Sequence, residues 1–333
     1  MVAACLLTLL GGGRAWAWGA EGHEYVGATA DQLLNDHARG QVQSILGFTL
    51  QTAATWPDCV RSVRQNGNRF VFTEDPQHPE YTAACTAFET PAEKARMEDY
   101  ASRNWSNCTY EPHHGCHEAY HFADVAELHG QYDRRYVGTS DHDIVSAINA
   151  AVAVLQGQPA PAPFSIRDGK EALFMLAHFV GDLHQPLHVG ALYLTRDGTE
   201  IDPDAPGADA VSTQTAGANL IHDGPTNLHA EWDDIPPDLG IAPSSAALAA
   251  ARQVPATPAP LGDLAKTWAS DSVAESHLAF AGLAFQGASG PHPRWYLQVA
   301  DRPDYTQRKR ALQEQQLIKG GAHLAELLNT IWP

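Results

Sequence analysis

The sequence predicts an all-α protein, built as a single helical domain with long loops and insertions. Apolar residues recur at helical spacing in several long segments, and no stretch alternates apolar and polar residues far enough to indicate a sheet. No internal repeat is visible. A chain of 333 residues with 44% hydrophobic content has enough apolar side chains for one large core.

Residues 1–17 are typical of a signal peptide. They contain a short apolar run, three glycines and then Ala15-Trp16-Ala17, a small-x-small cleavage pattern. The run is too short to span a bilayer as a mature helix, and we find no later transmembrane segment. We therefore expect a mature domain of residues 18–333 that begins at Trp18 and is secreted or periplasmic, without a membrane partner.

Four segments are predicted to be the main helices: residues 21–37, 170–183, 264–285 and 308–331. Pro186 should end or bend the chain after the second helix, because proline lacks the amide hydrogen that a helix needs. The final helix is expected to be interrupted at Gly320-Gly321.

Segments rich in turn-forming residues separate these helices. Residues 62–116 and 191–215 are predicted to be insertions, and residues 236–260 a proline-rich loop. Within the first insertion, Asn104-Trp105-Ser106 and Asn107-Cys108-Thr109 match the sequon for N-glycosylation.

The cysteines indicate disulfides. Once Cys5 leaves with the signal peptide, four remain: Cys59, Cys85, Cys108 and Cys116. An even number in an exported chain predicts two disulfides, for which three pairings are possible. The alternative is a zinc site, because three histidines surround the last two cysteines: His113, His114 and His117. An oxidising compartment favours the disulfides.

The charge balance restricts the function. A formal net charge of −18 disfavours binding to a polyphosphate, whose affinity comes mostly from lysine and arginine contacts. A nucleic-acid substrate would need a local source of positive charge, and bound metal is one. The 17 histidines make such a metal site plausible. The alternative is that the acidic charge only keeps a secreted protein in solution.

The strongest local motif lies in the helix at 170–183 and just beyond it. His178 and Asp182 are four residues apart in an apolar helix, so both side chains leave the same face. An unpaired carboxylate there is costly, and a metal shared with the imidazole removes that cost. After Pro186 the chain can turn His188 toward the same cavity, whereas His184 is off this face and predicted to be structural.

A second motif repeats this spacing. His229 and Asp233 are again four residues apart, and one such pair alone is usually a hydrogen bond on a helix face. Two pairs together with His188 provide the imidazole and carboxylate ligands that zinc accepts. Asp58 and His121 are weaker candidates, because an aspartate after proline usually caps a helix and a histidine between aromatic residues is usually packed.

Taken together, these residues resemble the zinc-dependent type I nucleases, the S1/P1 nuclease family, whose fold is shared with zinc phospholipase C. Mature family members begin with Trp-Gly-x-x-Gly-His, and here Trp18-Gly-Ala-Glu-Gly22-His23 follows the expected cleavage site. Residues 320–329 are also similar to the last helix of the family. The resemblance extends from Trp18 to the end of the chain.

The resemblance implies three Zn²⁺ ions. One would be held by Trp18, through its free amine and carbonyl, and by His23, with Asp182 as a bridge to the second. The second would also be held by Asp58, His121 and His178, and the third by His188, His229 and Asp233.

It also implies an endonuclease that cleaves single-stranded DNA and RNA to 5′-phosphorylated products, with 3′-nucleotidase activity. Asp182 as the bridging ligand, Asp58 as an acceptor for the nucleophile and Arg61 as a phosphate ligand are the expected catalytic residues. Phe122 and Asp124 would bind the base.

Asn219 is a further expected substrate contact, because Ala216-Gly217-Ala218-Asn219 stands where the family has Gly-Gly-Asn. We expect a monomer without a protein partner. Two alternatives are a zinc phospholipase C and a non-catalytic secreted zinc-binding protein.

Overall fold

The computed structural model describes residues 18–74, 83–108, 114–287 and 294–333, so the predicted signal peptide lies outside the described residues. Most elements are helices: α1 (Ala20–Leu33), α2 (Asp36–Leu46), α3 (Leu50–Ala53), α4 (Trp56–Val60), α6 (Pro91–Arg103), α7 (Ile144–Leu155), α8 (Gly169–Leu183), α9 (Ala210–Thr213), α10 (Leu228–Asp233), α11 (Ser245–Ala251), α12 (Leu264–Phe280) and α13 (Arg302–Ile331). Short 3₁₀ turns are η1 (Thr86–Phe88), η2 (Cys116–His121), η3 (Glu127–His129), η4 (Pro186–His188) and η5 (Leu261–Asp263). Across the described ranges, no helix combines the length and the apolar character needed to cross a membrane.

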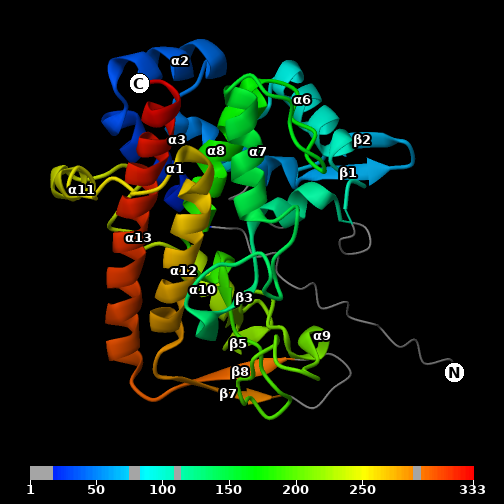
Figure 1. Ribbon diagram of the computed structural model, residues 1–333, viewed down its shortest axis with the longest axis vertical. Helices are drawn as coiled ribbons and strands as arrows, with labels where there is room; N and C mark the ends of the chain where they lie inside the picture. Colours follow the sequence, from blue (N-terminus) through cyan, green and yellow to red (C-terminus); the bar gives the residue numbers. More distant parts are fainter. Residues whose placement is uncertain (1–17, 75–82, 109–113, 288–293) are drawn as a thin grey trace, which may run out of the picture.

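Helix α8 lies at the centre of the helical part of the molecule (Figure 1). Every residue from Glu171 to Leu183 is buried, and the helix contacts α1, α7 and α13. Its N-terminus is capped by Asp168, whose carboxylate accepts from the backbone amide of Glu171 at 3.0 Å. A helix that is buried on all sides forms the core itself, so any polar side chain on α8 is forced into the interior.

Helix α13 begins at Arg302, ahead of the predicted start at residue 308, because the side chain of Asp301 caps it. It runs through Gly320 and Gly321 without a break, so the predicted interruption is wrong. A Cβ atom on Gly321 would lie 2.4 Å from Cβ of Thr29 on α1. The glycine therefore allows α1 and α13 to approach closely, and it does not end the helix.

Two other predicted helix boundaries are wrong for local reasons. The segment 21–37 is divided between α1 and α2, because Asn35 is extended and its side chain accepts from the amide of Ala38 at 2.8 Å, starting a new helix. The segment 264–285 ends as a helix at Phe280, because Gly282, with φ of 76°, turns the chain into a strand.

The all-α prediction is correct only in part, because the structure contains small sheets. The largest has the order β6-β5-β8-β7, with β5 (Ile221–Asp223), β6 (Thr226–Asn227), β7 (Leu283–Gly287) and β8 (Trp295–Val299). β5 and β8 are parallel, and the other pairs are antiparallel. This sheet lies beyond the lower ends of α12 and α13 in Figure 1. It was missed because each strand is at most five residues long.

Two shorter pairings and one helix also depart from the predictions. β1 (Val63–Asn66) and β2 (Arg69–Phe72) form a hairpin in which Val63 pairs with Phe72. β3 (Val125–Ala126) runs parallel to β4 (Gly190–Ala191). The predicted loop at 236–260 contains α11, whose N-cap is Ser244.

The disulfide prediction is confirmed, with the pairing Cys59–Cys85 and Cys108–Cys116. These four sulfurs are therefore not available to zinc, and the alternative zinc site among cysteines is excluded. Asn104 of the first sequon is fully buried, and its amide donates to the carbonyls of Tyr100 and Ser165, so a glycan cannot be attached there. Asn107 of the second sequon is exposed, but Thr109 lies outside the described residues.

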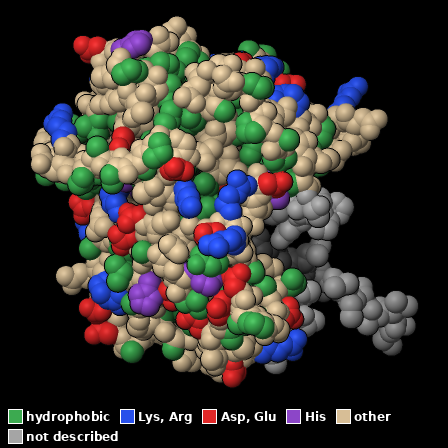
Figure 2. Space-filling model, in the orientation of Figure 1, with side chains coloured by type: hydrophobic (Ala, Val, Ile, Leu, Met, Phe, Trp, Pro, Cys, Tyr) green, Lys and Arg blue, Asp and Glu red, His purple; other side chains and the backbone are tan. Residues whose placement is uncertain are grey.

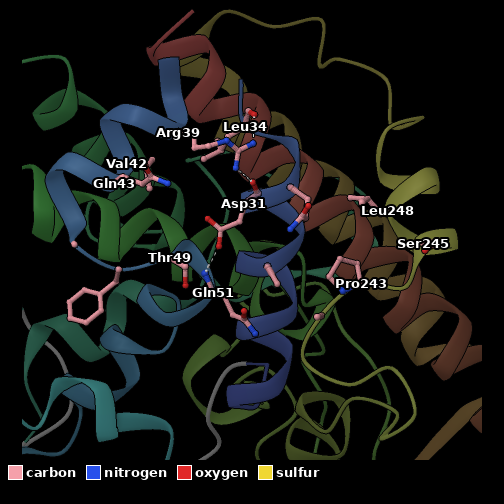
Figure 3. Close-up of a pocket in the computed structure, with 15 residues that line it drawn as sticks. Asp31, Leu34, Arg39, Val42, Gln43, Thr49, Gln51, Pro243, Ser245 and Leu248 are labelled. Carbon is pink, nitrogen blue, oxygen red and sulfur yellow. Dashed lines mark hydrogen bonds between the residues drawn. The ribbon is translucent and has the colours of Figure 1, made fainter. Parts of the chain in front are cut away.

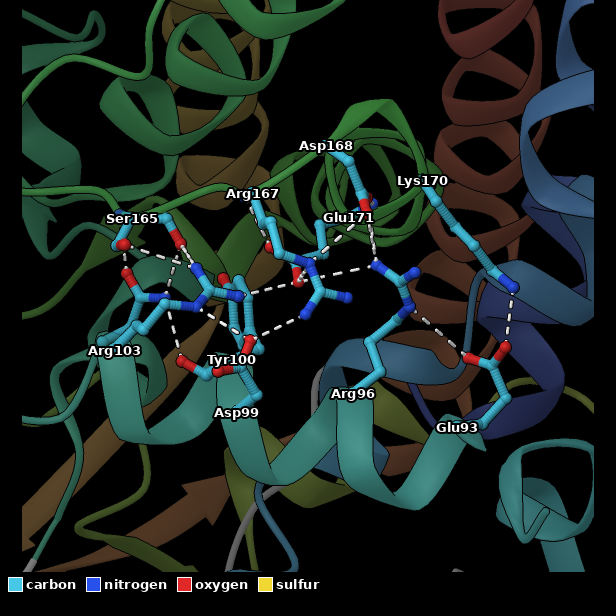
Figure 4. Close-up of polar contacts among 11 residues, drawn as sticks. Glu93, Arg96, Asp99, Tyr100, Arg103, Ser165, Arg167, Asp168, Lys170 and Glu171 are labelled. Carbon is cyan, nitrogen blue, oxygen red and sulfur yellow. Dashed lines mark hydrogen bonds and ion pairs between the residues drawn. The ribbon is translucent and has the colours of Figure 1, made fainter. Parts of the chain in front are cut away.

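A network of ion pairs fastens α6, from the predicted insertion 62–116, to the start of α8 (Figure 4). Glu171 is fully buried, and its carboxylate accepts from Nη2 of Arg103 and from the backbone amide of Arg167, both at 2.7 Å. Arg96 binds Asp168 at 2.8 Å beside it. A buried carboxylate is tolerated only when its lone pairs are used in this way, so α6 has a defined position on α8.

A pair of buried histidines joins the end of α8 to α13. Nδ1 of His184 lies 2.7 Å from the carbonyl of Val180 and must donate to it, so Nε2 accepts from Nδ1 of His323 at 2.7 Å. His323 stacks on Trp268 of α12 at 4.6 Å. Burial lowers the pKa of His184 to about 4 and that of His323 to about 2.

The His323→Phe variant should be less stable than wild type near neutral pH by about 1–2 kcal/mol, because the buried hydrogen bond is lost. As the pH falls below 6.5, the unfolded wild-type chain takes up a proton at His323, but the folded chain resists it until about 2. The free energy of unfolding of the wild type therefore falls by up to about 1.4 kcal/mol per pH unit through His323. The difference in free energy of unfolding between wild type and His323→Phe should shrink accordingly. Denaturant titrations at several pH values measure it.

The control is His37→Phe on the exposed surface of α2. It should differ from wild type by only a small amount near neutral pH, because the side chain is exposed and forms no part of the buried pair. A difference for His323→Phe that grows as the pH falls would contradict the buried neutral pair.

Candidate metal centre

The predicted pair on α8 occupies the middle of the core. His178 and Asp182 are both fully buried, and Nε2 of His178 lies 3.1 Å from Oδ2 of Asp182. The four-residue spacing therefore places both groups on one face, as the sequence predicted. The remaining candidate residues surround this face.

The first group of side chains surrounds the Asp182 carboxylate. Its Oδ1 lies 3.2 Å from Nε2 of His23 on α1, and its Oδ2 lies 3.0 Å from Nδ1 of His121 on η2. Asp58 on α4 approaches from the other side, with Oδ1 3.8 Å from His178 and 4.0 Å from His121. Five residues from four elements, α1, α4, η2 and α8, thus converge within hydrogen-bonding or metal-binding range.

The second group consists of His188 on η4 and the pair on α10. The Nε2 atoms of His188 and His229 are 3.1 Å apart, and Asp233 lies 3.5 Å from His229 and 3.9 Å from His188. Nδ1 of His188 is only 3.9 Å from Oδ1 of Asp182, so the two groups are adjacent.

Within these groups, three sets offer ligand atoms that all lie within 4.8 Å of one another. They are His23, Asp58 and His178; His121, His178 and Asp182; and His188, His229 and Asp233.

Backbone carbonyls orient three of the imidazoles. The contacts are His178 Nδ1 to Ala54 O at 2.6 Å, His188 Nδ1 to His121 O at 2.9 Å and His229 Nδ1 to Gly217 O at 2.5 Å. A carbonyl can only accept, so each Nδ1 carries the hydrogen and each Nε2 keeps a lone pair. In metal sites, such contacts fix the ring and leave the other nitrogen available for the ion.

The buried groups of the site shift one another's pKa in both directions. Burial would lower the pKa of His178, but Asp182 and Asp58 raise it, and burial raises the pKa of Asp233 well above its ordinary value. Burial lowers the pKa of His23 to about 4 and that of His229 to about 3. Burial would raise the pKa of Asp182, but His178, His188 and His23 hold it well below its ordinary value. Burial raises the pKa of Asp58 to about 6. Neutral imidazoles and ionised carboxylates are the forms that bind a metal.

The structure also leaves buried atoms without hydrogen-bond partners in the described part of the chain. They include both ring nitrogens of His23, Oδ1 of Asp182 and Oδ2 of Asp233. Orphaned lone pairs in the interior are costly, and nitrogen and oxygen donors at these distances fit divalent cations. The residues present can therefore hold metal.

The motif Trp18-Gly-Ala-Glu-Gly22-His23 lies against these groups. Trp18 is fully buried, and its indole nitrogen donates to the carbonyl of Gly181 at 2.8 Å. The backbone amide of Gly19 donates to the backbone carbonyl of Asp233 at 2.9 Å. A Cβ on Gly22 would lie 2.9 Å from Cβ of Trp18, which explains why the motif requires glycine there. Whether the Trp18 amine is a ligand stays a prediction.

The predicted catalytic and base-binding residues lie at the edge of the same groups. Nη1 of Arg61 is 3.4 Å from Oδ1 of Asp58, and the arginine side chain is 14% exposed. Phe122 and Asp124 are half-buried and follow His121 directly along the chain. Burial raises the pKa of Asp124 to about 6, and the amide of Gly217 donates to its carboxylate.

A strained loop joins Asp124 to the second group. Ala216, Gly217 and Ala218 are consecutive left-handed residues, with φ of 51°, 56° and 71°. Alanine is unfavourable in this region, so the loop is maintained by its surroundings. The side chain of Asn219 donates to the carbonyl of Ala216 at 2.8 Å and so closes this loop. A direct contact of Asn219 with substrate remains a prediction.

Sequence reasoning missed the groups that orient the ligands. Nothing in the sequence marks the carbonyls of Ala54 and Gly217, because every residue carries a carbonyl. Gln185 could have been found, since it lies inside the histidine motif. It is fully buried, and its Nε2 donates to Oδ1 of Asp233 at 2.7 Å.

A cavity of about 730 Å³ lies elsewhere, between α1, α2, α3 and residues 242–248 (Figure 3). None of the predicted site residues lines it. Its Asp31 carboxylate already accepts from the amides of Leu50 and Gln51 at 3.1 Å, and Arg39 donates to backbone carbonyls. Its charged groups are therefore used by the fold, in contrast to the orphaned atoms of the metal groups.

Comparison with known proteins agrees with this geometry. A model of the family described as S1/P1 Nuclease matches residues 18–333. Endonuclease 4 of Arabidopsis thaliana is 24% identical over 225 residues, a region that covers 66% of this chain and 56% of the relative. The chain thus spans little more than half the length of that curated relative.

The loop at Gly217 yields a test. In Gly217→Ala, the new Cβ would lie 2.6 Å from the carbonyl of Leu187 and 3.2 Å from Nδ1 of His229. The loop must shift, so we expect a loss of about 2–4 kcal/mol in the free energy of unfolding and weaker metal binding at His188 and His229. Chemical denaturation and equilibrium dialysis against zinc measure the two effects.

Gly224→Ala is the matched control. Gly224 has a similar φ of 60°, but a Cβ there would meet nothing within 4 Å. This variant should lose only about 1–2 kcal/mol, the cost of a left-handed alanine, and keep its metal. Equal effects of the two substitutions would show that the contact of the loop with His229 is unimportant.

Proposed function

Because the chain belongs to the S1/P1 nuclease family, we propose that it is a secreted zinc-dependent endonuclease acting on single-stranded DNA and RNA. Its products would carry 5′-phosphates, and it would also remove the phosphate of 3′-nucleotides. The observation that carries the proposal is the adjacency of the two His/Asp groups, 3.9 Å apart at His188 and Asp182. Export is supported by the two disulfides and by the signal-like segment 1–17.

The proposed ligands divide into three sets for three Zn²⁺ ions. They are Trp18, His23 and Asp182; Asp58, His121, His178 and Asp182; and His188, His229 and Asp233. When bound, zinc supplies positive charge beside the phosphate and lowers the pKa of coordinated water toward about 7. This local charge answers the problem posed by a net charge of −18.

Residues of the chain itself would position the attacking water and the phosphate. The pKa of Asp58 is raised by burial to about 6, so the group is ionised near neutral pH and can accept a hydrogen bond from the water. Arg61 lies 3.4 Å from Asp58 and carries a planar fork that suits two phosphate oxygens.

Single-strand preference is proposed to come from Phe122 and Asp124. A base that stacks on an aromatic ring gains about 1–3 kcal/mol and must first leave its own stack, which a duplex resists. The amide of Gly217 donates to the Asp124 carboxylate, which favours its ionised form, an acceptor for donors on the edge of a base. These two residues favour nucleotides over the phospholipid head groups of a phospholipase C.

Cleavage assays of the mature protein decide among the functions. We expect rapid cleavage of single-stranded DNA and RNA, slow cleavage of duplex DNA and no turnover of phosphatidylcholine micelles. The Asp182→Asn variant should lose bound zinc and at least about 10³-fold in rate, because both carboxylate oxygens face imidazoles of the first group.

Asp238→Asn is the control, since Asp238 makes an exposed ion pair with Arg310. It should keep full activity and zinc content. Lipid turnover without nucleic-acid cleavage would instead favour the phospholipase, and zinc binding without any turnover would favour a zinc-binding protein.

The role of the new N-terminus can be tested separately. Adding Gly-Ser ahead of Trp18 converts the proposed ligand amine into an amide, so the protein should bind one zinc ion less tightly and lose activity. The same two residues added after Pro333 should change neither property. Elemental analysis after dialysis provides the measurement, and a fully loaded N-terminal extension would rule out the amine as a ligand.

A further inference from the structure

A second cluster of metal-binding side chains lies where the insertion 191–215 meets η3. Nε2 of His129 is 2.9 Å from Oδ2 of Asp204 and 3.5 Å from Oδ1 of Asp202. One ligand atom from each of the three residues lies within 4.8 Å of the others. We refer to these three residues as the His129 cluster, and none of them belongs to the candidate metal centre.

The cluster is held in a defined geometry. The imidazole of His129 stacks on Tyr136 at 3.9 Å with an interplanar angle of 3°, and its side chain is only 12% exposed. Oδ1 of Asp204 accepts from the amide of Val137 at 3.0 Å, and the amide of Asp204 donates to Asp202 at 2.9 Å. Side chains that are fixed before a ligand arrives lose little freedom on binding.

The charge around the cluster is not balanced by lysine or arginine. A parallel contact joins the same two segments, where Glu127 on η3 faces Glu200 of the insertion. Burial, together with Glu127, raises the pKa of Glu200 to about 7. In the described part of the chain, Asp202 and Asp204 form ion pairs only with His129. Glu127 forms one only with His277. Figure 2 shows acidic side chains gathered on this lower part of the molecule.

The His129 ring hydrogen-bonds Asp204 and leaves the Asp202 carboxylate beside it without a close hydrogen bond from the ring. One imidazole hydrogen satisfies a single carboxylate oxygen and leaves Asp202 and Asp204 repelling each other. A divalent cation at the point where the three ligand atoms converge neutralises both carboxylates.

We propose that His129, Asp202 and Asp204 bind a Zn²⁺ ion that fastens the insertion 191–215 to η3. A nitrogen ligand together with two carboxylate oxygens suits zinc, whereas calcium prefers oxygen ligands only. The side chain of Asp202 is 41% exposed, so water can complete the coordination and the ion can exchange with solvent. The His129 cluster is therefore a structural site, separate from the candidate metal centre.

The segment 191–215 leads directly into the strained loop beside the candidate metal centre. An ion at the His129 cluster would therefore also affect the position of this loop. After Asp204 the chain forms α9 and pairs Gln214 with Tyr193, directly ahead of Ala216. The hydroxyl of Tyr193 in turn donates to the carbonyl of Asp124 at 2.8 Å. Zinc at the His129 cluster would hold this whole segment against the body of the protein.

Two conservative variants test the proposal. His129→Phe keeps the stacking on Tyr136 and removes the ligand nitrogen, and Asp202→Asn keeps the acceptor for the amide of Asp204 and removes the charge. After equilibrium dialysis at micromolar free zinc, each should hold one ion fewer per chain than wild type. Both should still cleave single-stranded DNA, because neither residue belongs to the candidate metal centre.

His277→Gln is the matched control, because His277 belongs to the parallel Glu127 contact and not to the cluster. It should hold as many ions as wild type. Limited proteolysis within 191–215 should be suppressed by zinc in wild type and in this control, but not in the two variants. A wild-type ion count in either variant that folds would overturn the proposal, whatever the nuclease assays show.

Discussion

Burial of the Asp182 carboxylate in the middle of the core is the constraint on which the rest of the structure depends. α8 is surrounded by other helices, so the charge cannot reach solvent and must be compensated inside. His23, His121 and His178 supply the compensation from three different elements. The helices therefore pack correctly only when the histidines meet Asp182, because a displaced helix would leave a buried charge unpaired.

The elements around this carboxylate are oriented mainly by the backbone. Carbonyls of Ala54, His121 and Gly217 each fix one imidazole, and the last lies in a loop of left-handed residues. Such a conformation is unfavourable by itself and persists because neighbouring contacts determine it. The amide of Gly217 also reaches Asp124, so one peptide unit connects the metal groups with the proposed base pocket. Backbone strain, the orientation of a candidate metal ligand and the proposed base pocket thus meet in the same short loop.

The predicted helices were largely correct because helical periodicity is expressed over a few turns of sequence. Their boundaries were less accurate, since Asn35 starts a new helix and Gly282 turns the chain by local geometry that periodicity does not register. The sheet of β5, β6, β7 and β8 was missed for a different reason. Its strands are too short to show alternation, and β5 pairs with β8 across a long stretch of chain. Gly321 was misread because its role depends on α1, which lies at the other end of the sequence.

The sequence by itself determined that His178 and Asp182, and separately His229 and Asp233, share a helix face, because a four-residue spacing fixes direction within one helix. The apolar run and cleavage pattern indicated the signal-like segment, and the even number of remaining cysteines indicated two disulfides. Only the tertiary structure decided that both pairs lie beside His188, which cysteines are joined and that residues 202 and 204 meet His129. Local spacing is a property of one helix, whereas convergence depends on how all the helices pack.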